Sequence, residues 1–548
     1  MQTRRDFLTG AASAGLATAI GPPILRPTPA AAQPSGIALP GEDWDAGQVA
    51  HLLPTVSHER MLIKASFNRP LAAAPVLQLG PQHRVRGQMT DTRGEFWQFD
   101  ASGLTPDTTY RLALASSDGR ALCEPWTLAT FPAPGERPTR LRLLIYTCGG
   151  GHDALTPVNG KTRFLSAAVR QRLLRRGLSF KPDALIANGD HVYWDLAAPR
   201  GSLLLGASLE AKAFAGNFDS KQPVLGTANE IFLRRAAGPQ IVPLYGALCR
   251  STPVFFIQDD HDFFDNDEAT DEVVTFPPRH WMLDLARTTQ RQYYPEFLPD
   301  PYRPAGLPGS AALDRPPGVA EAFGTLRYGM LAEILLYTIR RSQTLAGESA
   351  VFVDPDVEDW LKDRMAAREV AHVVNIPSNP PGWSAGKWGE WYPDILGDDG
   401  KLTTAKLKPY WQPGWLKQHD RLLSAVAAMP GRIPLVISGD LHALAEGRIM
   451  RSGNLDFEKN PIVAVLSGPL GTGDLLWPSA FRHIGALPPV HLIVQEDLKP
   501  LEENGFTVAD FTPESITLRF FRWNAHRDSV EAIDTLEPFR TTELRRPT

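Results

Sequence analysis

The feature that most constrains the fold is a recurring pattern, in which a short apolar run is followed at once by Gly, Asp or His residues. Its clearest example is residues 183–195, where 184–187 are all apolar, as is typical of a strand buried on both faces. Gly189 then allows a sharp turn, and Asp190 and Tyr193 follow it. Ligands collect beyond the carboxyl ends of strands in an α/β sheet, so this carboxylate and this phenol are candidate metal ligands.

Three other apolar runs, at 141–146, 253–258 and 433–438, predict further buried strands with the same kind of ending. Side chains able to bind a metal follow each of them: Cys148 after the first, Asp259, Asp260, His261 and Asp262 after the second, and Asp440 and His442 after the third. Clustered carboxylates repel one another unless a cation neutralises them, which favours a metal site. The alternatives at this point are a buried inert cysteine and an exposed acidic turn.

Spacing excludes two other kinds of site at the cysteine. A cysteine phosphatase loop would place Arg six residues after Cys148, where Ala154 stands, and a Walker loop would need Gly-Lys followed by Ser or Thr. A pair of arginines, Arg340 and Arg341, follows a further predicted strand at 331–338. Such a pair suits a phosphate or another anion, although a solvated basic turn would have the same sequence.

The overall composition is that of an ordinary globular protein, large enough for two or more domains. The chain has 548 residues, of which 43% are hydrophobic and 21% are charged. Its net charge of -5 argues against a nucleic-acid-binding protein, because such proteins are usually basic. Its 3 cysteines do not make up a disulfide framework.

The first 32 residues have the pattern of a removable export signal. A twin-arginine motif lies at 3–8, an Ala-rich, weakly apolar core at 11–20, and a small-residue cleavage site at 30–32. The core is too short and too rich in Gly and Ala for a membrane anchor. The sequence therefore predicts a signal peptide over 1–32, export by the twin-arginine machinery, a periplasmic or secreted location, and no stable membrane insertion.

Residues 41–131 are expected to form a small all-β domain of the fibronectin or immunoglobulin type. Alternating apolar residues, as around Met61 and Ile63, are typical of half-buried strands. The stretch 104–110 resembles the corner of such sandwiches, where a tyrosine hydroxyl, here that of Tyr110, bonds back to the backbone.

The remainder of the chain, 140–548, is expected to be one α/β domain. Spacing of the apolar residues predicts helices at 162–176, 357–365 and 415–429 and strands at 371–376, 461–466 and 515–523, the last an edge or second-layer element. A helical insertion is expected at 199–250. Two segments are expected to be covers: an irregular Pro-rich loop at 270–330, and a lid at 377–413 whose tryptophans either shape a substrate pocket or simply pack.

The order of these motifs resembles that of the alkaline phosphatase D family of calcineurin-like metallophosphoesterases. The resemblance rests on Cys148, Gly189-Asp190 with Tyr193, Asp259-Asp260-His261-Asp262, Arg340-Arg341, and Gly439-Asp440 with His442. It covers the export signal, the β domain and nearly all of the rest. It implies a four-layer αββα sandwich, preceded by the small all-β domain, with two or more metal ions at the strand ends.

The resemblance also implies roles for individual residues. Cys148, Asp190, Tyr193 and His442 would hold one ion, expected to be Fe³⁺, and Asp190, Asp260 and Asp440 a second, expected to be Ca²⁺ or another divalent ion. His261 would act as general acid or stabilise the transition state, and Asn266 and Arg340 would hold phosphate oxygens. Two positions depart from the pattern: Cys148 stands where the wider superfamily often has Asp-x-His, and Thr338 where many relatives have an acid.

The expected activity is hydrolysis of small-molecule phosphate esters, mono- or diesters, by a metal-bound hydroxide. One alternative is a phospholipase-type or phosphotriester hydrolase on the same site, because the covering segments would select the ester. Another is a non-catalytic extracytoplasmic binding protein, against which the intact Asp190, His261 and His442 argue.

Overall fold

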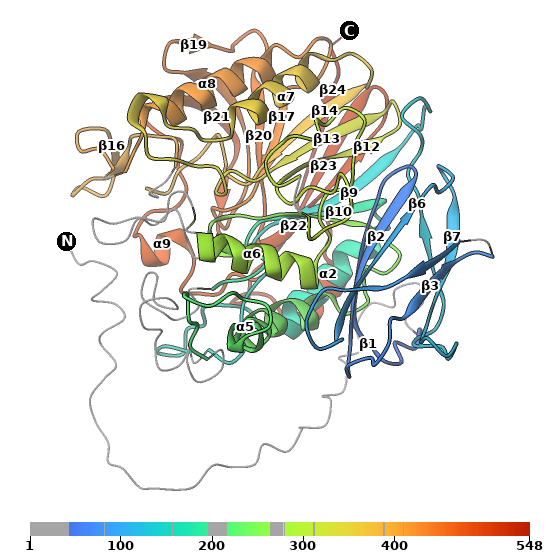
Figure 1. Ribbon diagram of the computed structural model, residues 1–548. Helices are drawn as coiled ribbons and strands as arrows, with labels where there is room; N and C mark the ends of the chain where they lie inside the picture. Colours follow the sequence, from blue (N-terminus) through green and yellow to red (C-terminus); the bar gives the residue numbers. More distant parts are fainter. Residues whose placement is uncertain are drawn as a thin grey trace, which may run out of the picture.

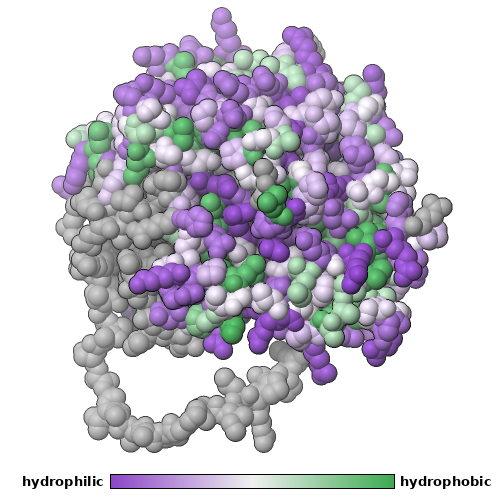
Figure 2. Space-filling model, in the orientation of Figure 1, coloured by the Kyte–Doolittle hydropathy of each residue, from purple (hydrophilic) through white to green (hydrophobic). Residues whose placement is uncertain are grey.

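The computed structural model describes residues 43–81, 83–155, 157–194, 216–263, 278, 280–310, 313–386, 390–408 and 410–547 (Figure 1). They form a mixed α/β fold with two large sheets, two four-stranded sheets near the N-terminus and one two-stranded sheet. The expected export signal at 1–32 lies outside the described residues. No helix in the described part of the chain is long and apolar enough to cross a membrane. Figure 2 shows mostly hydrophilic side chains on the described part of one face, with hydrophobic ones in small separate groups.

The N-terminal strands lie in two antiparallel sheets, with the orders β1-β2-β6-β5 and β4-β3-β7-β8. Their bounds are β1 (Val49–Val56), β2 (Arg60–Phe67), β3 (Val76–Leu79), β4 (His83–Arg86), β5 (Gln88–Met89), β6 (Phe96–Ser102), β7 (Thr109–Ala115) and β8 (Trp126–Ala129). Leu52 and Leu112, one from each sheet, belong to the same buried apolar cluster. The Tyr110 hydroxyl accepts a hydrogen bond from the Thr105 backbone N–H at 2.8 Å, which confirms the predicted tie.

The first large sheet contains the strand that leads to Asp190, and its order is β11-β10-β9-β22-β23-β24. Its bounds are β9 (Leu141–Tyr146), β10 (Ala184–Asn188), β11 (Val254–Ile257), β22 (Asn504–Phe511), β23 (Ser515–Trp523) and β24 (Arg540–Arg545). The strands β9, β10 and β11 are parallel, and the others pair antiparallel. Two helices, α2 (Ala167–Ser179) and α5 (Ala228–Tyr245), cover one face, where Leu173 and Leu244 join Leu185 in a buried cluster.

The second large sheet has the order β12-β13-β14-β17-β20-β18-β19, with β21 paired to β18. Its bounds are β12 (Phe323–Tyr328), β13 (Ala332–Tyr337), β14 (His372–Pro377), β17 (Leu435–Ser438), β18 (Leu444–Ser452), β19 (Leu455–Asp456), β20 (Ile462–Ser467) and β21 (Leu492–Leu501). The strands β13, β14, β17 and β20 are parallel. One face carries α7 (Pro355–Ala366) and α8 (Pro413–Ala427), at the top of Figure 1, whereas α2 and α5 lie at the bottom.

The two large sheets share a core because alternate residues of each strand point to opposite faces. Ile145 and Ile186 of the first sheet belong to the same buried cluster as Ile334 of the second. The sheets also meet where their parallel strands end, since the Asn188 side-chain amide donates a hydrogen bond to the Pro377 carbonyl at 3.1 Å. The loops that follow β9, β10, β11, β13 and β17 therefore gather at one edge of this core.

Most predicted helices and strands are present, but the expectation of an irregular loop over 270–330 is correct only for the described residues between 294 and 322. The stretch 270–330 also contains α6 (His280–Tyr293), which buries Met282 and Leu285, as well as β12. Prolines on both sides of this helix made its apolar spacing hard to recognise. The helix expected at 162–176 begins at Ala167, after the capping Ser166. The strand at 515–523 lies between β22 and β24 and is not an edge strand.

The part of the aromatic lid that the structure describes packs against the second sheet. Trp383 and Trp391 are buried, and both belong to the cluster that includes α7 and α8. These tryptophans therefore contribute to packing.

Shorter elements complete the described fold: β15 (Ile395–Leu396), β16 (Leu402–Thr403), α9 (Pro478–Phe481), and the 3-10 turns η1 (Asp260–Phe263), η2 (Gly347–Ser349) and η3 (Val530–Thr535).

Buried polar contacts join the N-terminal strands to α6 and the segment after it. The His51 ring bonds to the Ser66 hydroxyl at 2.5 Å and to the Tyr293 carbonyl at 2.7 Å. The Lys64 ammonium lies 2.9 Å from a carboxylate oxygen of Glu296. Burial lowers the pKa of His51 from 6.5 to about 4.

We expect His51 to make the folded protein sensitive to acid. Between pH 6.5 and about 4 the unfolded chain binds a proton at His51 that the folded chain does not, so stability is lost as pH falls through this range. The loss due to this group would approach about 3 kcal/mol. His51→Gln, which cannot titrate, should flatten the pH dependence of the free energy of unfolding measured in urea. An unchanged pH dependence in this variant would contradict the assignment.

Candidate metal centre

Four predicted ligands of one metal ion come together at the edge where the parallel strands end. Ligand atoms of Cys148, Asp190 and His442 all lie within 4.8 Å of one another. The Cys148 sulfur is 3.3 Å from Asp190 Oδ2. The Tyr193 hydroxyl donates to the same Asp190 oxygen at 3.1 Å and lies 3.4 Å from His442 Nε2. A thiol, a phenol, an imidazole and a carboxylate thus converge from three separate loops.

Two further groups overlap with this one and extend the centre. One consists of Asp190, Asp260 and His261, and the other of Asp259, Asp260 and Asp440, each with ligand atoms within 4.8 Å of one another. Asp190 and Asp260 each belong to two groups, so each carboxylate lies beside two of these clusters. The ligand set implied by the family resemblance does not include Asp259, although the acidic run to which it belongs was singled out as able to bind a metal.

The backbone at this centre adopts an uncommon conformation. In the described residues, 8 non-glycine residues have a positive φ, and four are candidate ligands: Cys148 (50°), Asp190 (57°), Asp440 (68°) and His442 (48°). Left-handed conformations of non-glycine residues are uncommon and cluster at functional sites. At Gly439, a Cβ atom would lie only 2.2 Å from the Thr147 hydroxyl oxygen, so glycine is needed for the close approach of two loops.

Burial makes the centre unfavourable for negative charge without a cation. Asp190 is 1% exposed, and burial, followed by the charge of Asp260, raises its pKa well above the usual value. Burial also raises the pKa values of Cys148 and Tyr193, and Asp190 adds to both effects. Asp190 Oδ1 accepts no hydrogen bond from the described residues. A bound cation would reverse these shifts, so the donor set fits a metal centre.

Arg340 contacts carboxylates of the centre. Its Nε donates to Asp259 Oδ1 at 2.8 Å and its Nη2 to Asp440 Oδ2 at 3.3 Å, and its side chain is fully buried. Its expected contact with phosphate oxygens stays a prediction. Arg341 pairs instead with Glu321, so the two arginines differ in their partners.

His261 lies at the margin of the centre. Its side chain is 14% exposed, its Nε2 is 3.8 Å from Asp260 Oδ2, and its ring centroid is 4.3 Å from that of Tyr193. This position is compatible with the expected role of a general acid. The other expected phosphate-binding residue, Asn266, lies outside the described residues. Thr338, which replaces an expected acid, donates to the Gln258 carbonyl at 2.6 Å.

Asp262 supports the turns that carry the ligands. Its Oδ1 accepts the backbone N–H groups of His191 and Val192, and its Oδ2 accepts those of Asp190 and Asp259, all at 3.0 Å. These four N–H donors compensate the negative charge of the Asp262 carboxylate, so no metal ion is required to do so. Asp262 therefore connects the loop after β10 with the loop after β11.

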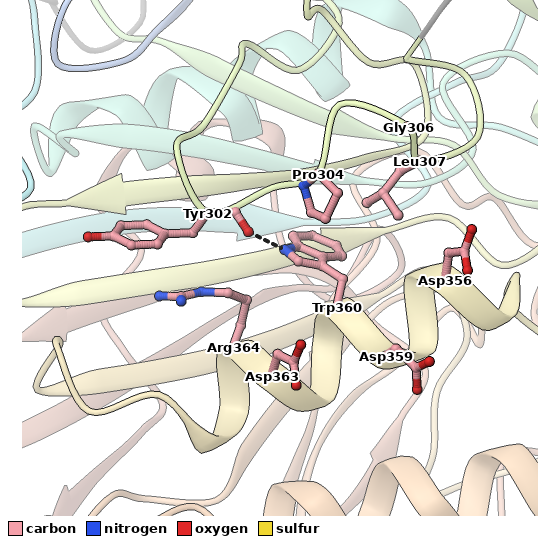
Figure 3. A pocket seen from close by; sticks show the side chains of 9 residues that line it. All are labelled: Tyr302, Pro304, Gly306, Leu307, Asp356, Asp359, Trp360, Asp363 and Arg364. Atoms are coloured by element: carbon pink, nitrogen blue, oxygen red, sulfur yellow. Dashed lines mark hydrogen bonds between the residues drawn. The ribbon is translucent and has the colours of Figure 1, made fainter.

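The hollow shown in Figure 3 lies elsewhere. It has a volume of about 470 Å³ and is lined by Tyr302, Pro304, Gly306, Leu307, Asp356, Asp359, Trp360, Asp363 and Arg364. Its Arg364 bonds to Glu333 near the start of β13, whereas the metal centre lies beyond the other end of that strand. The Trp360 indole N–H donates to the Tyr302 carbonyl at 3.1 Å. None of the predicted ligands lines this hollow.

Structural comparison shows that the fold is similar to those of two solved phosphatase structures. The structure of PhoD matches with a TM-score of 0.57 and 12% sequence identity, over 91% of this chain and 90% of that chain. The purple acid phosphatase PPD1 isolated from yellow lupin (Lupinus luteus) seeds matches with a TM-score of 0.53 and 11% identity, over 91% and 75%. No model of a protein family matches the sequence, and no curated protein matches it significantly. The expected likeness to alkaline phosphatase D is thus confirmed for the fold.

We expect Asp190→Asn and Asp262→Asn to change the stability of the metal-free protein in opposite directions. Removing the crowded Asp190 charge should stabilise it by roughly 1 kcal/mol, as with other substitutions at strained functional sites. In Asp262→Asn, the side-chain NH₂ group would face backbone N–H groups that the carboxylate of Asp262 accepts. This should destabilise the protein by about 1–3 kcal/mol. Urea unfolding in the presence of a chelator measures both. Destabilisation by Asp190→Asn as large as that by Asp262→Asn would contradict this description of the centre.

Proposed function

We propose that the chain is a metal-dependent phosphoesterase of the alkaline phosphatase D type that hydrolyses small-molecule phosphate esters. The observation that carries the proposal is the overlap of three ligand groups through Asp190 and Asp260 at the strand ends. Adjacent sites with shared carboxylates are the arrangement that two-metal phosphate chemistry requires. The metallophosphoesterase fold supports it independently.

The proposal includes an organisation of the whole chain. The two large sheets with their outer helices are the four-layer αββα domain, over 140–548, and the strands within 41–131 are a small fibronectin-like domain. Residues 1–32 are a twin-arginine signal, which gives a periplasmic or secreted enzyme. The order of the sheets in the chain supports this division.

The ligands divide according to their chemistry. Cys148, Tyr193 and His442, with Asp190, would hold Fe³⁺, because a thiolate and a phenolate are strong donors for a trivalent ion. Asp190, Asp260 and Asp440, to which Asp259 adds a further carboxylate, would hold Ca²⁺ or another divalent ion, because hard cations prefer oxygen ligands. When bound, these ions supply positive charge for the phosphate oxygens and lower the pKa of an attacking water.

The side chains of the protein supply the rest of the chemistry. The Arg340 guanidinium fixes the Asp259 and Asp440 carboxylates through two charge-assisted hydrogen bonds. His261, the more exposed imidazole, would give a proton to the leaving alkoxide, which would otherwise depart as a strong base. Asp262 holds the turn after β10 in place by accepting the backbone N–H groups of Asp190 and His191.

An ester with an apolar group, as in a phospholipase-type or triester substrate, is the second candidate. Half-buried Leu155 and Leu476 pack against Phe164 and Tyr193 beside the centre, and apolar side chains at this position favour an apolar leaving group. A purely binding role is disfavoured because Asp190, His261 and His442 converge.

We expect chelation, and separately Asp190→Ala, to abolish hydrolysis of p-nitrophenyl phosphate and bis-p-nitrophenyl phosphate. Loss of a bridging carboxylate should reduce kcat by at least about 10³-fold, because metal and water would no longer be held in place. Elemental analysis of the purified protein should find bound metal, with iron and calcium as the expected pair.

The control is Asp359→Ala, which removes an exposed carboxylate at the hollow of Figure 3 and should leave the rate unchanged. Full turnover by the Asp190→Ala variant after exhaustive chelation would refute the proposed function.

A further inference from the structure

The side chain of Gln240 makes four hydrogen bonds next to the candidate metal centre. It lies on α5 and is fully buried. Its Oε1 accepts the backbone N–H groups of Gly151 and Tyr193, both at 2.9 Å. Its Nε2 donates to the carbonyls of Tyr193 at 3.2 Å and Ala236 at 3.0 Å. An amide offers two donors and two acceptor positions, and all four are used here.

These bonds join two loops that carry ligands. Gly151 belongs to the loop after β9, which supplies Cys148, and Tyr193 belongs to the loop after β10, which also supplies Asp190. The loops touch directly as well, since the Gly150 N–H donates to the Asp190 carbonyl at 2.9 Å. We propose that Gln240 is a positioning residue that fixes the thiol and phenol ligands relative to each other. This inference rests on the proposed function.

A second buried side chain holds the same loop from the neighbouring helix α2. Arg170 is fully buried, and its guanidinium donates to the carbonyls of Gly149 and Gly151, each at 2.9 Å. It also reaches the Gln240 backbone carbonyl at 3.5 Å. Arg170 and Gln240 therefore hold the glycine-rich loop from two helices, although three successive glycines would otherwise leave that loop many conformations.

The other end of α5 is held by the loop between β5 and β6. Glu230 accepts a hydrogen bond from the Thr92 backbone N–H at 2.9 Å, and Arg234 donates to Asp91 at 2.7 Å and to Glu95 at 2.5 Å. These contacts fix α5 and with it the location of the Gln240 amide. The loop between β5 and β6 thereby contributes to the geometry of the candidate metal centre without supplying one of its candidate ligands.

The chain contains a matched control for this role. Gln418 on α8 is also buried; its Oε1 accepts the N–H groups of Phe352 at 2.7 Å and Val353 at 3.0 Å. Its Nε2 donates to the Val353 carbonyl at 2.7 Å and to Glu358 at 2.8 Å. The segment that it holds carries none of the candidate ligands. Gln240 and Gln418 thus perform the same structural task, one at the metal centre and the other away from it.

The experiment compares Gln240→Leu with Gln418→Leu. Both should lower the urea midpoint, because each removes four hydrogen bonds made in the protein interior: to four backbone groups at Gln240, and to three backbone groups and the Glu358 carboxylate at Gln418. Only Gln240→Leu should weaken metal binding, by about 10- to 100-fold, as is usual when a residue that orients ligands is removed. The probe is Co²⁺ added to the metal-free protein, with its visible absorption and thiolate charge-transfer band as readouts.

Gln240→Glu is the second variant, with which Co²⁺ binding is measured if Gln240→Leu does not fold. It retains the two accepted N–H groups and loses the donors to Tyr193 and Ala236, so its Co²⁺ affinity should fall between those of the wild type and Gln240→Leu. Wild-type affinity and an unchanged charge-transfer band in both Gln240 variants would overturn the positioning role, as would equal weakening by Gln418→Leu. Absence of Co²⁺ binding by the wild type would instead refute the proposed function, and the positioning role with it.

Discussion

Four carboxylates are buried together where the two large sheets meet, and their mutual repulsion is the constraint that the surrounding structure has to balance. Asp190, Asp259, Asp260 and Asp440 are each at most 4% exposed and come from three separate loops. Burial removes the solvent that would otherwise screen them. Arg340 bonds to two of the four, whereas burial and the charge of Asp260 raise the pKa of Asp190, a shift that a bound cation would oppose.

The scaffold keeps these groups close through several independent restraints. The parallel strands of both sheets end at one edge, four ligand residues take left-handed backbone conformations, and Asp262 and Gln240 connect neighbouring loops through their side chains. Each of these restraints acts on backbone groups of the chain itself and does not use a candidate metal-ligand atom. The geometry is therefore a property of the fold, and metal ions would add to it the charge that it lacks.

The sequence was most informative where the signal is local. The apolar run at 184–187 with Gly189 and Asp190 after it contains both the strand and its turn, and the structure shows both. The same is true of the runs that precede Cys148 and Asp440. These motifs could be joined into one centre only through the family resemblance, because nothing in a single strand-end motif shows which other loops it will meet.

What could not be predicted depends on contacts between distant segments. Gln240 is ordinary within α5, and its importance comes from Gly151 and Tyr193, which lie 89 and 47 residues away in the chain. The helix α6 was missed because prolines flank it and because its buried face packs on the N-terminal strands. The pairing of Arg340 with Asp259 and Asp440 likewise spans 81 and 100 residues, so the sequence showed its charge and strand-end position but not its partners.

The most direct test of the central claim is a crystal structure with anomalous diffraction recorded at the absorption edges of the metals found in the purified protein. We expect two anomalous peaks about 3.5–4 Å apart, one beside the Cys148 sulfur and the Tyr193 oxygen and the other beside Asp260 and Asp440, with Asp190 between them. Protein that is folded and saturated with metal, yet shows no peak within bonding distance of Asp190, would contradict the claim.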